Sequence, residues 1–214
     1  MQNKYSNIIW DWNGTLLDDA ALCLNVLNAL LRDRGFNPIA DVTAYREIFG
    51  FPIIDYYRRA GFDFEKEAFE ITAKDFIKLY HSDANRFHLF PDAIQIISAA
   101  KEAGISQVIL SASDKDNLRS QIEPFGIMHY FDEVIGISNI YAESKVSAGA
   151  EYAARTNLDK SKTLFIGDTV HDYEVAAALG VDCMLIASGH QSKERLLKCG
   201  ASVIDNISLI KKYI

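Results

Sequence analysis

The sequence predicts an α/β protein built on a doubly wound parallel sheet, with a helical segment inserted into it. The first observation is a set of short apolar runs that resemble buried parallel strands, at residues 8–10, 107–110, 163–166 and 183–187. The second is a set of helical patterns that alternate with these runs, at residues 91–103, 114–123 and 170–179. Strand–helix alternation favours a parallel sheet with helices on both faces.

The first apolar run ends abruptly at Asp11 and is followed by the turn signal Asn13-Gly14. This pattern is typical of a buried strand that delivers its carboxyl end to a loop. In parallel α/β sheets, ligands bind outside the carboxyl ends of the strands. The loop after residue 10 is therefore the first candidate for chemistry.

Residues 18–88 show a different pattern, in which helical stretches follow one another without a convincing strand. Leucines recur at helical spacing over residues 20–34, and an apolar stripe runs along residues 64–80. We therefore expect a core domain formed by residues 1–17 and 89–214, and a helical cap domain formed by residues 18–88. Most aromatic side chains of the cap are expected to form its own core, because a small domain needs large side chains to bury enough area.

Composition limits the classes of function. The 214 residues suffice for one core plus a smaller unit, and 49% hydrophobic with 24% charged residues indicates a globular protein. The formal net charge of −7 disfavours nucleic acid as a partner. Three cysteines without a CxxC spacing argue against a disulfide framework or a zinc site. The sequence contains neither a signal-peptide pattern nor an apolar run of about 18 residues, so we expect a cytoplasmic protein without membrane contact.

Reactive residue types occur at four predicted loop positions: Asp11 with Asn13-Gly14-Thr15, Ser111, Lys145, and Asp168 with Asp172. Phosphoryl transfer requires an oxygen nucleophile, a divalent cation and donors to the phosphate oxygens. Asp11 can supply the nucleophile and form an aspartyl-phosphate, while Asp168 can bind Mg²⁺. Asp172, one helical turn further on, can complete the metal shell directly or through water.

These residues resemble the ordered motifs of the haloacid dehalogenase (HAD) superfamily. The matches are Asp11-Trp12-Asn13-Gly14-Thr15, Ser111, Lys145 and Gly167-Asp168-Thr169-Val170-His171-Asp172, and together they span nearly the whole chain. The resemblance implies a Rossmann-like core, and the inserted segment is similar to the C1-type cap of the phosphoglycolate-phosphatase-like branch. It also implies Mg²⁺ as the cofactor and a small-molecule phosphate ester as the substrate.

Site roles carried over from this resemblance fall into three groups. The catalytic positions are Asp11 and Asn13, and the metal ligands are Asp11, Asn13 through its backbone carbonyl, Asp168 and Asp172. The phosphate-binding residues are Gly14, Thr15, Ser111, Ala112 and Lys145. Lys145 departs from the pattern because the family's lysine is usually followed by proline and Val146 follows here.

Asn13 is a second departure, since phosphatases of the family usually carry aspartate two positions after the nucleophile. That aspartate protonates the leaving oxygen and later activates water, which an amide cannot do at neutral pH. General acid–base catalysis contributes roughly 10²–10⁴-fold, so its loss predicts a slow enzyme. His171 and His190 are candidate substitutes, and a structural or surface role is the alternative for each.

The predicted cap loop at residues 49–53 is apolar and bears on rival activities of the superfamily. A phosphonatase would be expected to place a lysine near Ile53, and a phosphosugar mutase an arginine. Dehalogenase chemistry has no use for a metal-binding pair of aspartates. Arg46, Arg58 and Arg59 are the cap cations available to an anionic substrate tail, with an exposed solvated face as the alternative.

The sequence thus predicts a Mg²⁺-dependent phosphatase acting on a small, phosphoglycolate-like monoester, as a monomer or homodimer. Two alternatives stay open. One is a slow or inactive phosphate-binding or regulatory protein, because the acid–base position is Asn13. The other is a phosphonatase-like enzyme.

Overall fold

The computed structural model describes residues 4–82, 86–137 and 145–214. Within these residues six parallel strands form one sheet in the order β3-β2-β1-β4-β5-β6. Their bounds are β1 Asn7–Trp10, β2 Ser106–Asp114, β3 Glu133–Ile137, β4 Thr163–Gly167, β5 Asp182–Ile186 and β6 Ser202–Ile204. The chain builds outward from β1 in one direction and then in the other, which confirms the predicted doubly wound sheet.

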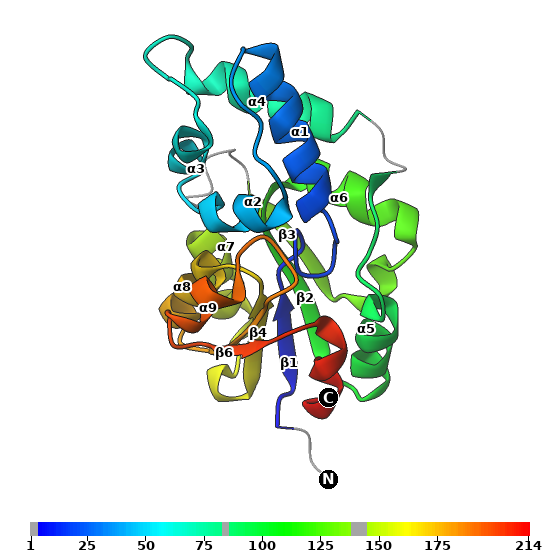
Figure 1. Cartoon of the computed structure of the whole chain (residues 1–214). Coiled ribbons are helices and arrows are strands. Elements are labelled where there is room, and N and C mark those ends of the chain that lie inside the picture. The colour runs from blue at the N-terminus through cyan, green and yellow to red at the C-terminus, as the bar shows by residue number, and fades with distance from the viewer. Residues whose placement is uncertain (1–3, 83–85, 138–144) are drawn as a thin grey trace.

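Helices cover both faces of this sheet and form a separate layer above its carboxyl ends (Figure 1). The helices after the inserted segment are α5 Ala93–Glu102, α6 Lys115–Ile122, α7 Lys145–Thr156, α8 Val170–Leu179 and α9 Lys193–Leu197. Short 3-10 helices lie at Glu123–Phe125, Met128–Tyr130, Lys160–Lys162 and Ile207–Lys212. The upper layer consists of α1 Ala20–Asp33, α2 Val42–Ile48, α3 Ile53–Ala60 and α4 Phe69–Tyr80.

Side chains of β1 alternate between the two faces of the sheet, as the period of a strand requires. Ile9 packs into a cluster with α7 and α8, which includes Tyr152 and Val175. Ile8 and Trp10 belong to the larger cluster, which also contains apolar residues of α5. Burial on both faces explains why this strand is continuously apolar in sequence.

The chain leaves the sheet region and returns to it at neighbouring points. Leu17 and Leu89 form an isolated antiparallel bridge, and the Asp18 N–H donates to the His88 carbonyl at 2.8 Å. The helices α1–α4 lie between these two points, and we call residues 18–88 the cap segment. The expected domain boundaries at 17/18 and 88/89 stay a prediction.

Several element boundaries differ from those expected. The helix expected over residues 64–80 begins at Phe69, and β2 continues past Leu110 to Asp114. The helix expected over residues 114–123 ends at Ile122, but a 3-10 helix then passes through Pro124, because proline at the first turn needs no N–H partner. β3, β6 and α9 were not expected from the sequence.

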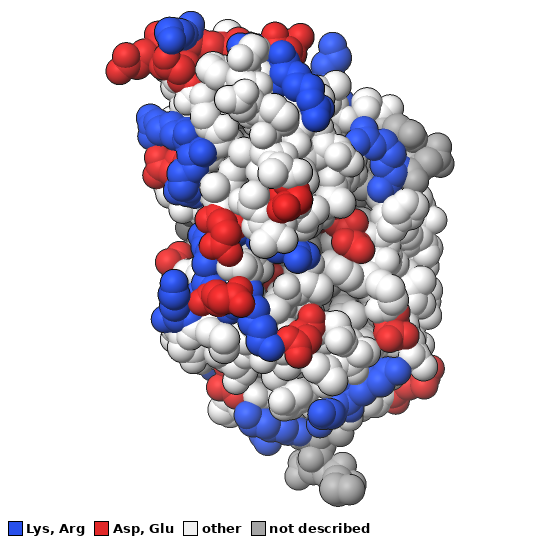
Figure 2. All heavy atoms as spheres, viewed as in Figure 1, with Lys and Arg blue, Asp and Glu red and all other residues white. Residues whose placement is uncertain are grey.

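On the face shown in Figure 2, acidic and basic side chains are interspersed. Among the helices of the described residues, none combines the length and the apolar character needed to cross a membrane.

Candidate active site

Asp11 lies at the switch point of the sheet, directly after β1. Its backbone N–H donates to the Ile166 carbonyl of β4 at 2.8 Å, which holds the residue between the two strands where the chain changes direction. The carboxylate is buried and lines a cavity of about 210 Å³ between the sheet and the cap segment. This is the position at which open α/β sheets bind ligands.

Lys145 is the first residue of α7, as expected, and its side chain is 2% exposed. Its Nζ donates to Asp11 Oδ1 at 2.5 Å and to Asp172 Oδ1 at 2.6 Å. Burial opposes the charge of Lys145, but the two carboxylates hold its pKa above the usual value. Burial raises the pKa of Asp11 to about 6, although the Lys145 ammonium works against that rise.

Asp168 and Asp172 are positioned by the start of α8. Thr169 caps this helix and Asp172 completes a capping box, since its Oδ2 accepts from the Thr169 N–H at 3.0 Å and from the Thr169 hydroxyl at 2.6 Å. Burial would raise the pKa of Asp172, but Lys145 holds it below the usual range. Asp172 therefore both caps α8 and forms an ion pair with Lys145.

Glycine is required on two sides of Asp168. A Cβ at Gly14 would lie 2.3 Å from Asp168 Oδ2, and one at Gly189 would lie 2.2 Å from the same oxygen. Gly14 also has φ +74°, a conformation that side chains disfavour. The two glycines let the loops after β1 and β5 approach this carboxylate.

The acidic cluster fits a divalent cation. Asp11, Asp168 and Asp172 each offer an oxygen, and these oxygens lie within 4.8 Å of one another. When all three carboxylates are ionised, they exceed the single ammonium of Lys145 by two negative charges. Burial and the neighbouring carboxylates raise the pKa of Asp168 well above its usual range, although His190 opposes this rise. Oxygen-only ligands with this charge suit Mg²⁺.

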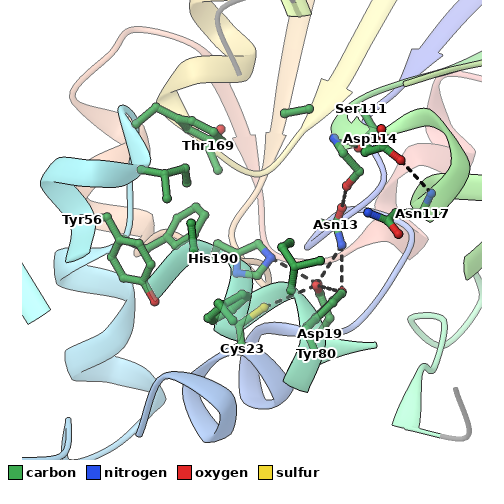
Figure 3. Close-up of a pocket in the computed structure, with 18 of the residues that line it drawn as sticks. Asn13, Asp19, Cys23, Tyr56, Tyr80, Ser111, Asp114, Asn117, Thr169 and His190 are labelled. Carbon is green, nitrogen blue, oxygen red and sulfur yellow. Dashed lines mark hydrogen bonds and ion pairs between the residues drawn. The ribbon is translucent and has the colours of Figure 1, made fainter. Parts of the chain in front are cut away.

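Asn13 is fixed by hydrogen bonds on both sides of its amide. Its Nδ2 donates to Asp19 Oδ2 and to the Tyr80 hydroxyl, each at 2.9 Å, and its Oδ1 accepts from the Ser113 hydroxyl at 2.8 Å. Figure 3 shows Asn13, Asp19, Tyr80 and His190 gathered at one side of the cavity. The residue to which the resemblance assigns the acid–base role is thus an amide, and both of its N–H groups already donate hydrogen bonds.

Asp19 is the centre of this group and is almost fully buried. Besides Asn13, it accepts from the Tyr80 hydroxyl at 2.5 Å and from the Gly14 N–H at 2.9 Å, and it lies 3.1 Å from His190 Nε2. Burial would raise the pKa of Asp19, but the charge of His190 holds it below the usual value. Asp19 therefore stays ionised.

His190 pairs with Asp19 and bridges the two layers. Its Nδ1 lies 2.7 Å from the Tyr45 hydroxyl of α2, and its ring stacks on Phe49 with centroids 4.6 Å apart. Burial would lower the pKa of His190, but the Asp19 carboxylate raises it to about 9. The ring is consequently protonated at neutral pH, with both nitrogens donating.

The structure brings the predicted site residues together around one cavity, lined by Asp11, Asn13, Ser111, Ala112, Lys145, Asp168, Asp172 and His190. Thr15 lies beneath them, with its hydroxyl 3.2 Å from Asp11 Oδ2 and 3.3 Å from Asp168 Oδ1. The Gly14 N–H, predicted to bind phosphate, donates to Asp19 and to the Leu17 carbonyl. The roles assigned to all these residues stay predictions.

Other candidates lie outside the cavity lining. His171 does not line it, and its Nδ1 lies 3.4 Å from Glu174. Arg46, Arg58 and Arg59 do not line it either.

Asp19, Tyr80 and Ser113 were missed by sequence reasoning. Asp19 follows Asp18 at the start of α1, where acidic residues commonly cap a helix. Its side chain makes no capping hydrogen bond, and this becomes visible only in the structure. Tyr80 ends a helical apolar stripe and was therefore expected to belong to the core of the cap segment.

Comparison with known proteins of similar sequence and fold shows to which family this chain belongs. It is 27% identical over 188 residues to a phosphoglycolate phosphatase from Rhodobacter capsulatus, covering 86% of this chain and 85% of that protein. It is 24% identical over 191 residues to a phosphoglycolate phosphatase from Synechococcus elongatus, covering 89% and 87%. A haloacid dehalogenase-like hydrolase from Streptococcus pneumoniae shares the fold, with a TM-score of 0.84 at 19% identity over 98% of each chain. The sequence profile of the haloacid dehalogenase-like hydrolases matches residues 8–186, and the chain belongs to that family.

Proposed function

We propose that this hydrolase is a Mg²⁺-dependent phosphatase that cleaves a small phosphate monoester through an aspartyl-phosphate on Asp11. The observation that carries the proposal is the pairing of Asp11 with Lys145 at 2.5 Å, at the carboxyl end of β1 and on the wall of a cavity. The ammonium holds the nucleophile in place and offers positive charge to a phosphate.

On this proposal the reaction has two steps. A carboxylate oxygen of Asp11 attacks phosphorus, the phosphorus–oxygen bond of the ester breaks, and the leaving oxygen takes up a proton from solvent water. Water then attacks the aspartyl-phosphate, releasing inorganic phosphate and restoring the Asp11 carboxylate. Ser111 and Lys145 are proposed to hold the non-bridging oxygens during both steps.

Asp11, Asp168 and the backbone carbonyl of Asn13 are the proposed metal ligands. Both oxygens of Asp172 already accept hydrogen bonds from Lys145 and Thr169, which favours contact through water for this residue. When bound, Mg²⁺ would offset the negative charge of the phosphate and of Asp11.

Asn13 bears on the rate. Its amide can neither protonate the leaving group nor activate water, so the expected turnover is roughly 10²–10⁴-fold slower than with a general acid in place. A phosphate-binding or regulatory protein is the second candidate, and Asn13 is the observation that favours it. The retained Asp11 supports catalysis, because a binding site gains nothing from an extra carboxylate facing phosphate. No lysine lies near Ile53 in the sequence to support the phosphonatase alternative.

The first test is the hydrolysis of p-nitrophenyl phosphate with Mg²⁺ and with EDTA. We expect Mg²⁺-dependent turnover that Asp11→Asn lowers by about 10⁴-fold or more, as expected for loss of a nucleophile. Asp33→Asn, which removes a carboxylate that is 81% exposed, is the matched control and should keep the native rate. If Asp11→Asn and the native protein turn over at equal rates, Asp11 is not the nucleophile. Phosphate binding without any turnover would support the second candidate.

A further inference from the structure

The cavity beside Asp11 has two walls of different chemistry. The wall formed by the sheet and its loops carries Lys145, polar side chains and every carboxylate of the lining except Asp19. The wall formed by the cap segment is largely aromatic and aliphatic, and includes Phe49, Phe51, Tyr57, Phe69, Phe76 and Ile77. A phosphate seated on the polar wall would direct its leaving group toward this apolar wall.

The arginines of the cap segment cannot neutralise an anionic leaving group in this arrangement. Arg46 and Arg59 donate to backbone carbonyls at 2.7 and 2.8 Å, and Arg58 pairs with Asp55 at 2.7 Å. Among the described residues no arginine lines the cavity, and the remaining segments of the chain contain no arginine or lysine. His81 lines the cavity, but burial lowers its pKa and keeps it neutral at pH 7.

The cationic side chains that do line the cavity are already paired. Lys145 is held by Asp11 and Asp172, and His190 is held by Asp19. Asp114 adds a further carboxylate to the lining. Neutral donors such as Asn117 and the unpaired Tyr56 hydroxyl also line the cavity, but a leaving group with its own carboxylate, such as glycolate, would be desolvated there without a free cation to balance its charge, which is costly.

We infer that the preferred substrate is not phosphoglycolate but a phosphate monoester whose leaving group is uncharged and apolar. An aromatic ring is the leaving group that fits the apolar wall best. This inference rests on the proposed phosphatase function. The aromatic wall gains free energy by burying apolar surface and by ring–ring contacts. The whole cavity of about 210 Å³ exceeds the roughly 150 Å³ that holds a benzene molecule in a protein interior, and the phosphate would occupy the remaining volume on the polar side.

The leading test compares kcat/KM for benzyl phosphate, 4-carboxybenzyl phosphate and phosphoglycolate with Mg²⁺. The two benzyl esters differ only in the carboxylate, which is remote from the reacting bond, so their ratio isolates the charge of the leaving group. We expect benzyl phosphate to exceed each of the others by at least about tenfold. A ratio of one or less, or a preference for phosphoglycolate, would overturn the inference while leaving the phosphatase function intact.

A pair of variants on α4 tests whether the leaving group contacts the cap segment. Ile77 lines the cavity and is 40% exposed, whereas Ile71 on the same helix is 51% exposed and does not line it. Ile77→Arg should shift the ratio of benzyl to 4-carboxybenzyl phosphate toward the anion by about tenfold or more. Ile71→Arg should leave that ratio within about twofold of the native value. Equal ratios in both variants would place the leaving group elsewhere.

A binding measurement separates this inference from the proposed function. Benzylphosphonate and phosphonoacetate are non-hydrolysable and carry the same contrast between an apolar and an anionic group. Calorimetry with Mg²⁺ should give at least about tenfold tighter binding of benzylphosphonate, whether or not the protein turns over esters. Absence of turnover on p-nitrophenyl phosphate would reject the phosphatase, and tighter binding of phosphonoacetate would reject the preference.

Discussion

The core and the cap segment each hold one cation between two carboxylates, and the two arrangements differ in burial. In the core, Lys145 contacts Asp11 and Asp172, and all three side chains are nearly inaccessible to water. In the cap segment, Arg34 contacts Glu67 at 2.6 Å and Asp75 at 2.7 Å, and both carboxylates remain partly exposed. Water can therefore hydrate the cap carboxylates when the cation is lost, but not those of the core.

The difference in burial also separates the roles of these two similar clusters. The Arg34 cluster joins the end of α1 to α4, and solvent completes the hydration of its two partly exposed carboxylates. The Lys145 cluster also contains the nearby carboxyl group of Asp168, so that three buried carboxyl groups lie beside one ammonium. A buried excess of carboxyl groups beside a cavity is therefore the stronger sign of a ligand site.

Removing the cation from each cluster should give the largest difference in stability. Lys145→Met leaves two buried carboxylates without a cation, and we expect it to lower the free energy of unfolding by about 3–5 kcal/mol. Arg34→Met should lower it by about 1 kcal/mol. Urea unfolding in EDTA measures both values, and Mg²⁺ should then restore stability more in Lys145→Met than in Arg34→Met. Equal losses would show that burial does not distinguish the two clusters.

The Asp19–His190 pair gives the next largest effect, because it is buried between the core and the cap segment and can titrate. Since the pKa of folded His190 is raised to about 9 from an unfolded value near 6.5, the folded protein binds the proton more tightly. The pair's contribution is complete below pH 6.5 and is lost as the pH rises through 9. The difference corresponds to about 3 kcal/mol.

Unfolding in EDTA at pH 6, 7.5 and 9 tests this linkage. The native protein should lose stability over this interval relative to His190→Gln, which cannot titrate there. Parallel curves for the two proteins would show that the pair does not bind a proton more tightly in the folded state.

Sequence reasoning located the site residues that belong to the core, because these residues lie directly after a strand or at the start of a helix. Asp11 follows an apolar strand, and Asp168 precedes a helix whose cap includes Asp172, so local pattern and order along the chain determine where they lie. The same logic predicted the four central strands. β6, with three residues at the edge of the sheet, is too short to show a periodic pattern.

The cap half could not be predicted in the same way. Phe76 and Tyr80 lie on one apolar stripe of α4, and this stripe supplies both the interior of the cap segment and the cavity wall. Helical periodicity shows that such a face is buried but not what it faces. The contact of Asp19 with His190 joins residues 171 positions apart, and neither belongs to the motifs that carried the resemblance.

Among the changes at the candidate site, Asn13→Asp has the smallest expected effect on stability, and it tests how closely the side chains of the core and of the cap segment are matched. The new carboxylate would lie where Nδ2 now donates to Asp19 Oδ2 at 2.9 Å, and two carboxylates that close cannot both be ionised. We expect the free energy of unfolding to fall by about 2 kcal/mol at pH 7.5, and by less at pH 5, because protonation relieves the repulsion.

Turnover should nevertheless rise in Asn13→Asp, because a shared proton at this position can be given to the leaving group. The double variant Asn13→Asp with Asp19→Asn is the matched control, since it restores one donor and one acceptor across the same contact. It should keep the gain in kcat and relieve the repulsion between residues 13 and 19, but it should remain less stable than the native protein, because it also removes the charge that pairs with His190. If Asn13→Asp alone is as stable as the native protein at both pH values, Asp19 does not face residue 13 as an ionised group. The match between the core and the cap segment would then depend on His190 and Tyr80 instead.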